Sequence, residues 1–192
     1  MATKPGERKL QILQTLAEML EKPAAEKVTT AALAARLDVS EAALYRHFAS
    51  KAQMFEGLIA FIEETIFGLV NKITGEQTSG LAQIEAILVM LLGFAKKNPG
   101  MTRVLIGDAL VNENERLQLR INQLHDRLEA SLKQSLRFAV TQKEIPESVD
   151  ATAHANLLLC YVVGRWHQYA KSGFKRDPME LWAEQWKQLV PA

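Results

Sequence analysis

The chain has 192 residues, of which 48% are hydrophobic, so it can bury a substantial core and disorder is excluded for most of it. The longest apolar run, residues 86–95, is much shorter than the roughly 20 residues that span a bilayer, and the N-terminus lacks the apolar stretch of a signal peptide. A net charge of +1 excludes a uniformly basic, histone-like protein. We therefore expect a folded cytoplasmic protein whose affinity for any nucleic acid depends on local charge.

The residues that usually carry catalysis or bind metals form no recognisable motif. The chain contains no G-x-S-x-G pattern and no phosphate-binding glycine loop, and its four histidines form no H-E-x-x-H or Cys/His cluster. His154 and His167 are too far apart along one helix to share a metal. The single cysteine, Cys160, lies in the apolar run 157–163, which predicts a buried side chain. We expect no enzyme, no cofactor and no metal site.

Hydrophobic periodicity predicts about nine helices and no strand. The first helix is expected over residues 7–21, with Pro23 ending it. Thr29 and Thr30 carry hydroxyls suited to capping a second helix over residues 31–37.

A tight turn and two further helix starts follow within a short stretch. Asp38 and Val39 are expected to form the turn, because aspartate tolerates the left-handed conformation better than most residues. Ser40 is suited to capping a short helix over residues 41–48. The S-x-x-Q pattern at residues 50–53 matches a capping box and predicts a long helix that reaches about residue 73.

The rest of the chain is also predicted to be helical. An amphipathic stripe of Leu, Ile and Val at spacings of three or four runs along residues 112–142. Asp177 is suited to capping the last helix, with Pro178 at its first position. A helix over residues 81–97 is expected to stop at residues 98–100, and a shorter helix follows to about residue 110. The last two predicted helices cover residues 148–172 and 178–189.

Residues 40–51 form the centre of a predicted helix-turn-helix, in which a short helix enters the major groove and the preceding helix braces it. Leu44 and Phe48 lie four residues apart and are expected to face inward, which turns Tyr45 and His47 toward DNA. These two side chains, Lys51 and the first amides of the following helix are candidate phosphate ligands. Ordinary packing is the alternative for Tyr45 and His47.

Residues 39–51, V-S-E-A-A-L-Y-R-H-F-A-S-K, resemble the signature of TetR-type regulators, which is Tyr-x-His-Phe followed by Ser-Lys. The resemblance implies an all-α, TetR-like fold with a three-helix DNA-binding head at 1–51 and a larger helical body at 52–192. It also implies a homodimer formed through the last two helices. The DNA-binding residues are then expected to be Thr29, Thr30, Ser40, Glu41, Ala42, Tyr45, Arg46, His47 and Lys51. The dimer interface is expected to include Leu158, Tyr161, Val162 and Trp166.

Several short pieces of the first two thirds of the chain are similar to the SlmA family of nucleoid occlusion factors. They are residues 12–14, 29–31, 39–48, 91–94, 98–100, 116–118 and 120–124. This resemblance implies a nucleoid-associated protein that binds palindromic chromosomal DNA sites and antagonises polymerisation of the division protein FtsZ. Whether dimers assemble in pairs on DNA stays open.

The family's groove for the FtsZ tail maps onto five positions of this chain, which are Phe61, Met90, Gly93, Lys97 and Asn98. A glycine inside a helix is costly, so Gly93 indicates the close approach of either a bound peptide or a neighbouring helix. This chain departs from the family at Leu69, which replaces a groove arginine, and in its less basic N-terminal arm.

A ligand-responsive TetR-type transcriptional repressor is the alternative function. Such a protein would bind a small effector in a cavity of the body, where Trp166, His125 or His167 are candidate lining residues. Core or interface positions are the other interpretation of these three side chains.

Overall fold

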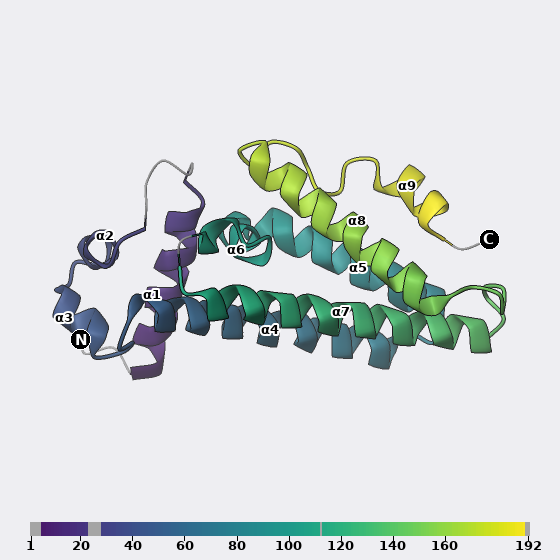
Figure 1. Cartoon of the computed structure of the whole chain (residues 1–192), viewed down its shortest axis with the longest axis horizontal. Helices are drawn as coiled ribbons and strands as arrows, with labels where there is room; N and C mark the ends of the chain where they lie inside the picture. The colour runs from purple at the N-terminus through teal and green to yellow at the C-terminus, as the bar shows by residue number, and fades with distance from the viewer. Residues whose placement is uncertain (1–4, 23–27, 112, 191–192) are drawn as a thin grey trace. The chain divides into compact units, whose positions relative to one another are not determined.

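The computed structural model describes residues 5–22, 28–111 and 113–190. These ranges contain nine α-helices, a short 3-10 helix and no strand, which confirms the all-α prediction of about nine helices (Figure 1). A bilayer-spanning helix, which needs an extended and nearly uncharged apolar stretch, is not found among the described residues. The helices are α1 (Pro5–Leu20), α2 (Thr30–Arg36), α3 (Glu41–Tyr45), α4 (Lys51–Glu76), α5 (Gly80–Lys97), α6 (Pro99–Leu105), η1 (Asp108–Leu110), α7 (Glu115–Thr141), α8 (Ala151–Lys171) and α9 (Trp182–Leu189).

The chain forms two compact units, which are described here one at a time. Unit 1 comprises Met1–Ile62 and Asn98–Ile121, and contains α1 to α3, the start of α4, α6, η1 and the start of α7. Unit 2 comprises Glu63–Lys97 and Asn122–Ala192, and contains the remainder of α4 and α7 together with α5, α8 and α9. The predicted domain boundary after residue 51 stays a prediction.

In unit 1, α1 and α6 cross at very short range. A Cβ added at Gly100 would lie 1.9 Å from the carbonyl oxygen of Ala17, so only glycine fits this position. The guanidinium of Arg103 on α6 donates to the carbonyl oxygen of Leu20 at 3.1 Å, which satisfies an acceptor left unpaired at the end of α1. Pro23, expected to end this helix, lies outside the described residues.

The predicted helix caps of unit 1 are confirmed. Three hydroxyl oxygens accept hydrogen bonds from main-chain N–H groups three residues further on, at the starts of α2, α3 and α4. The side chain of Gln53 reaches back to the N–H of Ala49 at 2.9 Å, so the expected capping box closes one residue earlier than its usual form. The three capping side chains are Thr29, Ser40 and Ser50.

The core of unit 2 contains the contact between α5 and α8. Trp166 on α8 is fully buried, and its indole N–H donates to the carbonyl oxygen of Leu91 on α5 at 3.1 Å. The hydroxyl of Tyr169 donates to the carbonyl oxygen of Lys96 at 3.2 Å. The stripe predicted on α7 is confirmed within this unit, where four leucines are fully buried. These are Leu124, Leu128, Leu132 and Leu136.

The predicted start of the last helix is wrong, because α9 begins at Trp182 and not at Pro178. The buried guanidinium of Arg165 donates to the carbonyl oxygens of Asp177, Pro178 and Glu180 at 2.8, 3.0 and 2.8 Å. Carbonyl groups that converge on one guanidinium cannot align along a helix axis, so this segment forms turns and the helix starts after it.

The prediction that Cys160 is buried is also wrong, because its side chain is exposed in this chain. A continuous apolar run on a helix places residues on every side of the axis, since each residue turns the helix by about 100°. Leu158 and Val162 face the core. Leu157, which is 50% exposed, and Cys160 face away from it.

Candidate nucleic-acid interface

The helices α2 and α3 form the predicted helix-turn-helix. Asp38 has a φ of 53°, which confirms the left-handed turn residue, and the N–H of Val39 donates to the carbonyl oxygen of Ala34 at 3.0 Å. Leu33 on α2 and Leu44 on α3 are each 1% exposed, so both helices are anchored in the core of unit 1. Apolar packing therefore holds α3 as a rigid element.

The outer face of α3 and the turn that follows it carry the predicted reading residues. Leu44 and Phe48 are buried, whereas Tyr45 is 45% exposed, which confirms the expected orientation of this helix. His47 is half-buried and Arg46 is exposed. Among the described residues Arg46 has no ion pair, so its charge is available to an external anion.

The helix α3 is shorter than predicted and ends at Tyr45 instead of Phe48. The N–H of His47 donates to the carbonyl oxygen of Leu44 at 2.9 Å, a bond of three residues that tightens the chain at the end of the helix. The tightened turn brings the chain round to α4, which begins at Lys51.

Five of the predicted DNA-binding side chains already make hydrogen bonds within unit 1, and four of these lie at the starts of α2 and α3. The hydroxyls of Thr29 and Ser40 cap α2 and α3. The hydroxyl of Thr30 donates to the carboxylate of Glu41 at 2.6 Å and so joins the two helices. The exposed Ala42 keeps the reading helix narrow, which lets the backbone approach base edges.

Lys51 has a partner that the sequence did not reveal. Its ammonium forms an ion pair with the carboxylate of Glu113 and lies 5.6 Å from the centre of the Phe55 ring. The two paired side chains are 25% and 15% exposed. Because Glu113 is separated from Lys51 by 62 residues, no local pattern predicts the pair.

The residues predicted to bind an FtsZ tail are divided between the two units, and each is described alone. In unit 1, Phe61 and Asn98 are half-buried. In unit 2, Met90 is half-buried and Lys97 is exposed. A Cβ added at Gly93 would meet no atom of the described part of the chain within 4 Å, so a close helix crossing does not explain this glycine.

The residues predicted for a dimer interface are mostly part of the core. Leu158, Val162 and Trp166 are at most 1% exposed within unit 2 and have almost no surface left for a second copy. Tyr161 is half-buried, and its hydroxyl donates to the side chain of Gln185 on α9 at 2.8 Å. Burial raises the pKa of this hydroxyl. The predicted interface, which stays a prediction, therefore requires the exposed face of α8.

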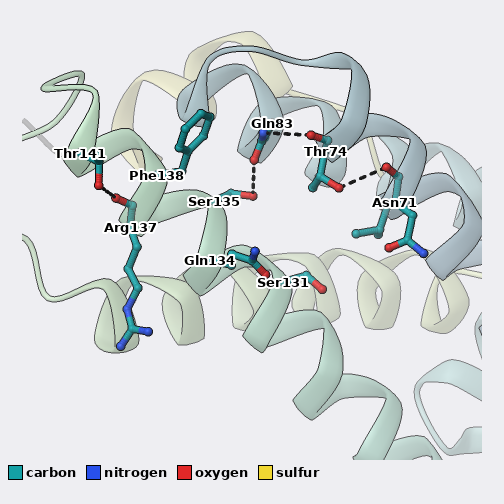
Figure 2. Close-up of a pocket in the computed structure, with 10 residues that line it drawn as sticks. Asn71, Thr74, Gln83, Ser131, Gln134, Ser135, Arg137, Phe138 and Thr141 are labelled. Carbon is teal, nitrogen blue, oxygen red and sulfur yellow. Dashed lines mark hydrogen bonds between the residues drawn. The ribbon is translucent and has the colours of Figure 1, made fainter.

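Unit 2 contains a pocket of about 510 Å³ between α4, α5 and α7 (Figure 2). Two buried side chains form one wall of the pocket, and the hydroxyl of Ser135 donates to the amide oxygen of Gln83 there at 3.0 Å. The amide nitrogen of Gln83 donates to the carbonyl oxygen of Thr74 at 3.3 Å. The rest of the lining is largely polar and includes Asn71, Ser131, Gln134, Arg137 and Thr141. Trp166, His125 and His167 do not line this pocket; Trp166 instead packs against His125, with ring centres 6.1 Å apart.

The chain matches two family profiles. Residues 12–58 match the bacterial regulatory proteins of the tetR family, and residues 77–191 match the SlmA-like tetracyclin repressor-like C-terminal domain. Proteins named nucleoid occlusion factor SlmA from Marinomonas sp. and Alteromonas mediterranea are 49% and 51% identical. The alignments cover 99% and 96% of this chain, and 96% and 95% of the relatives. The chain belongs to the SlmA family of nucleoid occlusion factors.

Solved structures confirm the TetR-like fold of this SlmA family member. A TetR transcription regulator from Haloarcula marismortui is 18% identical with a TM-score of 0.80, covering 96% of each chain. The regulator FadR from Bacillus subtilis, solved in complex with stearoyl-CoA, is 15% identical with a TM-score of 0.77, covering 94% of this chain and 97% of that one. At these identities the similarity concerns the fold alone.

Proposed function

We propose that the chain is a sequence-specific DNA-binding inhibitor of cell division, which acts over the nucleoid in the cytoplasm by antagonising FtsZ polymerisation. The observation that carries the proposal is identity of about half of all residues, over nearly the full length, to proteins named nucleoid occlusion factor SlmA. The exposed outer face of α3 supports the DNA-binding part.

DNA binding would combine base contacts from α3 with phosphate contacts around it. Tyr45, Arg46 and His47 have side chains that point away from the core or are only half-buried. Phosphate contacts dominate affinity and base contacts give specificity, so affinity should fall steeply with salt while sequence preference persists.

Dimerisation would use the exposed face of α8, where five residues at spacings of three and four lie on one side of the helix. Two heads related by a two-fold axis need half-sites about one helical turn apart, so the site should be palindromic. Leu157→Asp should give monomers in sedimentation analysis, whereas Leu119→Asp, on α7 in unit 1, should not. The five residues are Ala153, Leu157, Cys160, Gly164 and His167.

Antagonism of FtsZ would depend on the exposed end of α5. Lys97 has no ion pair among the described residues, whereas the neighbouring Lys96 donates to the carboxylate of Asp177 at 2.6 Å. Lys97 is therefore free to bind an acidic peptide, and the open space at Gly93 leaves room for a peptide backbone. Several protein copies on one DNA would raise the avidity of such a weak contact.

The matched pair Lys97→Gln and Lys96→Gln tests this part, because both variants remove one charge from adjacent positions. We expect Lys97→Gln to weaken inhibition of FtsZ assembly much more than Lys96→Gln, with DNA affinity unchanged in both. Equal effects, or no effect of the parent protein with its DNA on FtsZ assembly, would contradict the proposed partner.

Mapping the bound sites across the chromosome tests the whole proposal. Sites scattered over the chromosome support nucleoid occlusion, whereas a few sites at promoters support transcriptional repression.

Regulation by a small ligand is the second candidate function, and the pocket of unit 2 is the observation that favours it. Its volume of about 510 Å³ is in the range of small-molecule sites. The described residues that line it include no carboxylate, so a polar ligand without a positive charge suits it best. A thermal-shift screen of polar metabolites, followed by DNA titration of any hit, would decide whether a ligand changes DNA affinity.

A further inference from the structure

The ion pair between Lys51 and Glu113 places a carboxylate beside a side chain that the sequence predicts to bind a DNA phosphate. Lys51 is the first residue of α4, and it follows the turn that ends the helix-turn-helix. Glu113 lies between η1 and α7, in the same unit. The carboxylate side chain is only 15% exposed, so water competes weakly for it.

The segment that carries Glu113 is fixed against the start of α4. The N–H of Glu113 donates to the carbonyl oxygen of Leu110 at 2.9 Å, which closes a turn. The guanidinium of Arg116 lies 2.7 Å from the carboxylate of Glu56, and Arg120 donates to the carbonyl oxygen of Glu56 at 3.2 Å. Two contacts between the start of α7 and the second turn of α4 therefore keep the carboxylate of Glu113 within reach of Lys51.

We infer that Glu113 sets the DNA affinity of the head by occupying the ammonium of Lys51 until a DNA phosphate displaces it. The inference rests on the proposed function, because it requires that Lys51 binds a phosphate. One ammonium cannot pair fully with two anions, and a carboxylate left beside a phosphate repels it. Binding therefore has to break the internal pair and move Glu113 away, and both steps reduce affinity.

The inference predicts effects of opposite sign on stability and on affinity. Glu113→Gln should bind DNA roughly twofold to fivefold more tightly, because the competing charge is gone. The same variant should melt at a slightly lower temperature, because the free protein loses an ion pair. If Glu113 only stabilised the fold, its substitution would lower both the DNA affinity and the melting temperature.

A double-mutant cycle separates the pair from the general effect of charge. The probe is a duplex recovered from a random-sequence library by the parent protein, with dissociation constants measured at one fixed salt concentration. The variants are Glu113→Gln, Lys51→Gln and the double substitution. Glu115→Gln is the matched control, because it removes an exposed carboxylate two residues away.

We expect Glu113→Gln to tighten binding more than Glu115→Gln, and this excess to shrink when Lys51 is already glutamine. An equal gain from the two variants, or the same excess without Lys51, overturns the inference and leaves DNA binding intact. Failure of the parent protein to enrich any duplex overturns the DNA-binding proposal and the inference together.

Discussion

Lys51 in unit 1 and Arg165 in unit 2 are both largely withdrawn from solvent, but different acceptors hold them. Lys51 pairs with one side-chain carboxylate, that of Glu113. Arg165 donates to the carbonyl oxygens of three residues between α8 and α9. A carboxylate can rotate away, whereas main-chain carbonyls move only when their turn unfolds. Burial alone therefore does not distinguish a cation that can exchange its partner for DNA from a cation that only holds the fold together. The type of acceptor distinguishes them.

The largest expected effect is on the structural cation. Arg165→Met leaves three main-chain carbonyls without their donor and should lower the free energy of unfolding by about 2–4 kcal/mol. Urea unfolding at fixed protein concentration measures this. Arg176→Met is the control, since Arg176 is half-exposed and its carboxylate partner Glu180 lies 3.6 Å away. Equal losses of stability in the two variants would show that the three main-chain carbonyl acceptors of Arg165 contribute little to the free energy of unfolding.

Removal of the exchangeable cation should act mainly on DNA binding, with only the slight loss of stability that follows from breaking the ion pair with Glu113. Lys51→Gln should weaken binding by roughly threefold to tenfold and make the salt dependence shallower by about 0.9 in log–log slope, because one phosphate contact is lost. Titration at several salt concentrations measures both values. The exposed Lys72 of unit 2 supplies the control, and Lys72→Gln should leave the slope unchanged. A slope that is the same in the parent and in Lys51→Gln would remove Lys51 from the interface.

A smaller effect is expected where the acceptor is an exposed carboxylate. The hydrogen bond from Lys96, followed by the N–H of Met179, holds the pKa of Asp177 below its ordinary value of 3.8. A lowered pKa in the folded state stabilises the fold above the ordinary value, and this contribution disappears as the pH falls through the lowered pKa. The stability difference between the parent and Asp177→Asn should therefore shrink below about pH 4. A difference that stays constant down to pH 2 would contradict this assignment.

The smallest expected effect concerns the free space beside two glycines of α5, Gly93 and Gly80. Gly93→Ala adds a methyl group that meets no atom within 4 Å, so melting should be unchanged or stability should rise by up to about 1 kcal/mol. Gly80→Ala in the same helix should destabilise, because its Cβ would lie 2.3 Å from the main-chain nitrogen of Ala139. Calorimetry of both variants measures the contrast. A clear loss of stability in Gly93→Ala would mean that this face of α5 is packed.

The sequence determined those features that depend on residues within about one helical turn of each other. The caps of α2, α3 and α4 follow from hydroxyls placed three residues before a free N–H group. The turn at Asp38 and the inward faces of Leu44 and Phe48 also follow from local conformational preference and from helix periodicity. The helix-turn-helix was therefore predictable from a dozen residues.

Only the tertiary structure decided which distant groups meet. Glu113 is 62 residues from Lys51, and periodicity gives no information at that separation. The uniform apolar run on α8 does not indicate which side faces the core, so the expectations of an outward Leu158 and an inward Cys160 are the reverse of their burial. Asp177 and Pro178 have the local pattern of a helix start, but the buried guanidinium of Arg165 needs acceptors for its N–H donors, and the carbonyl oxygens of these two residues supply them.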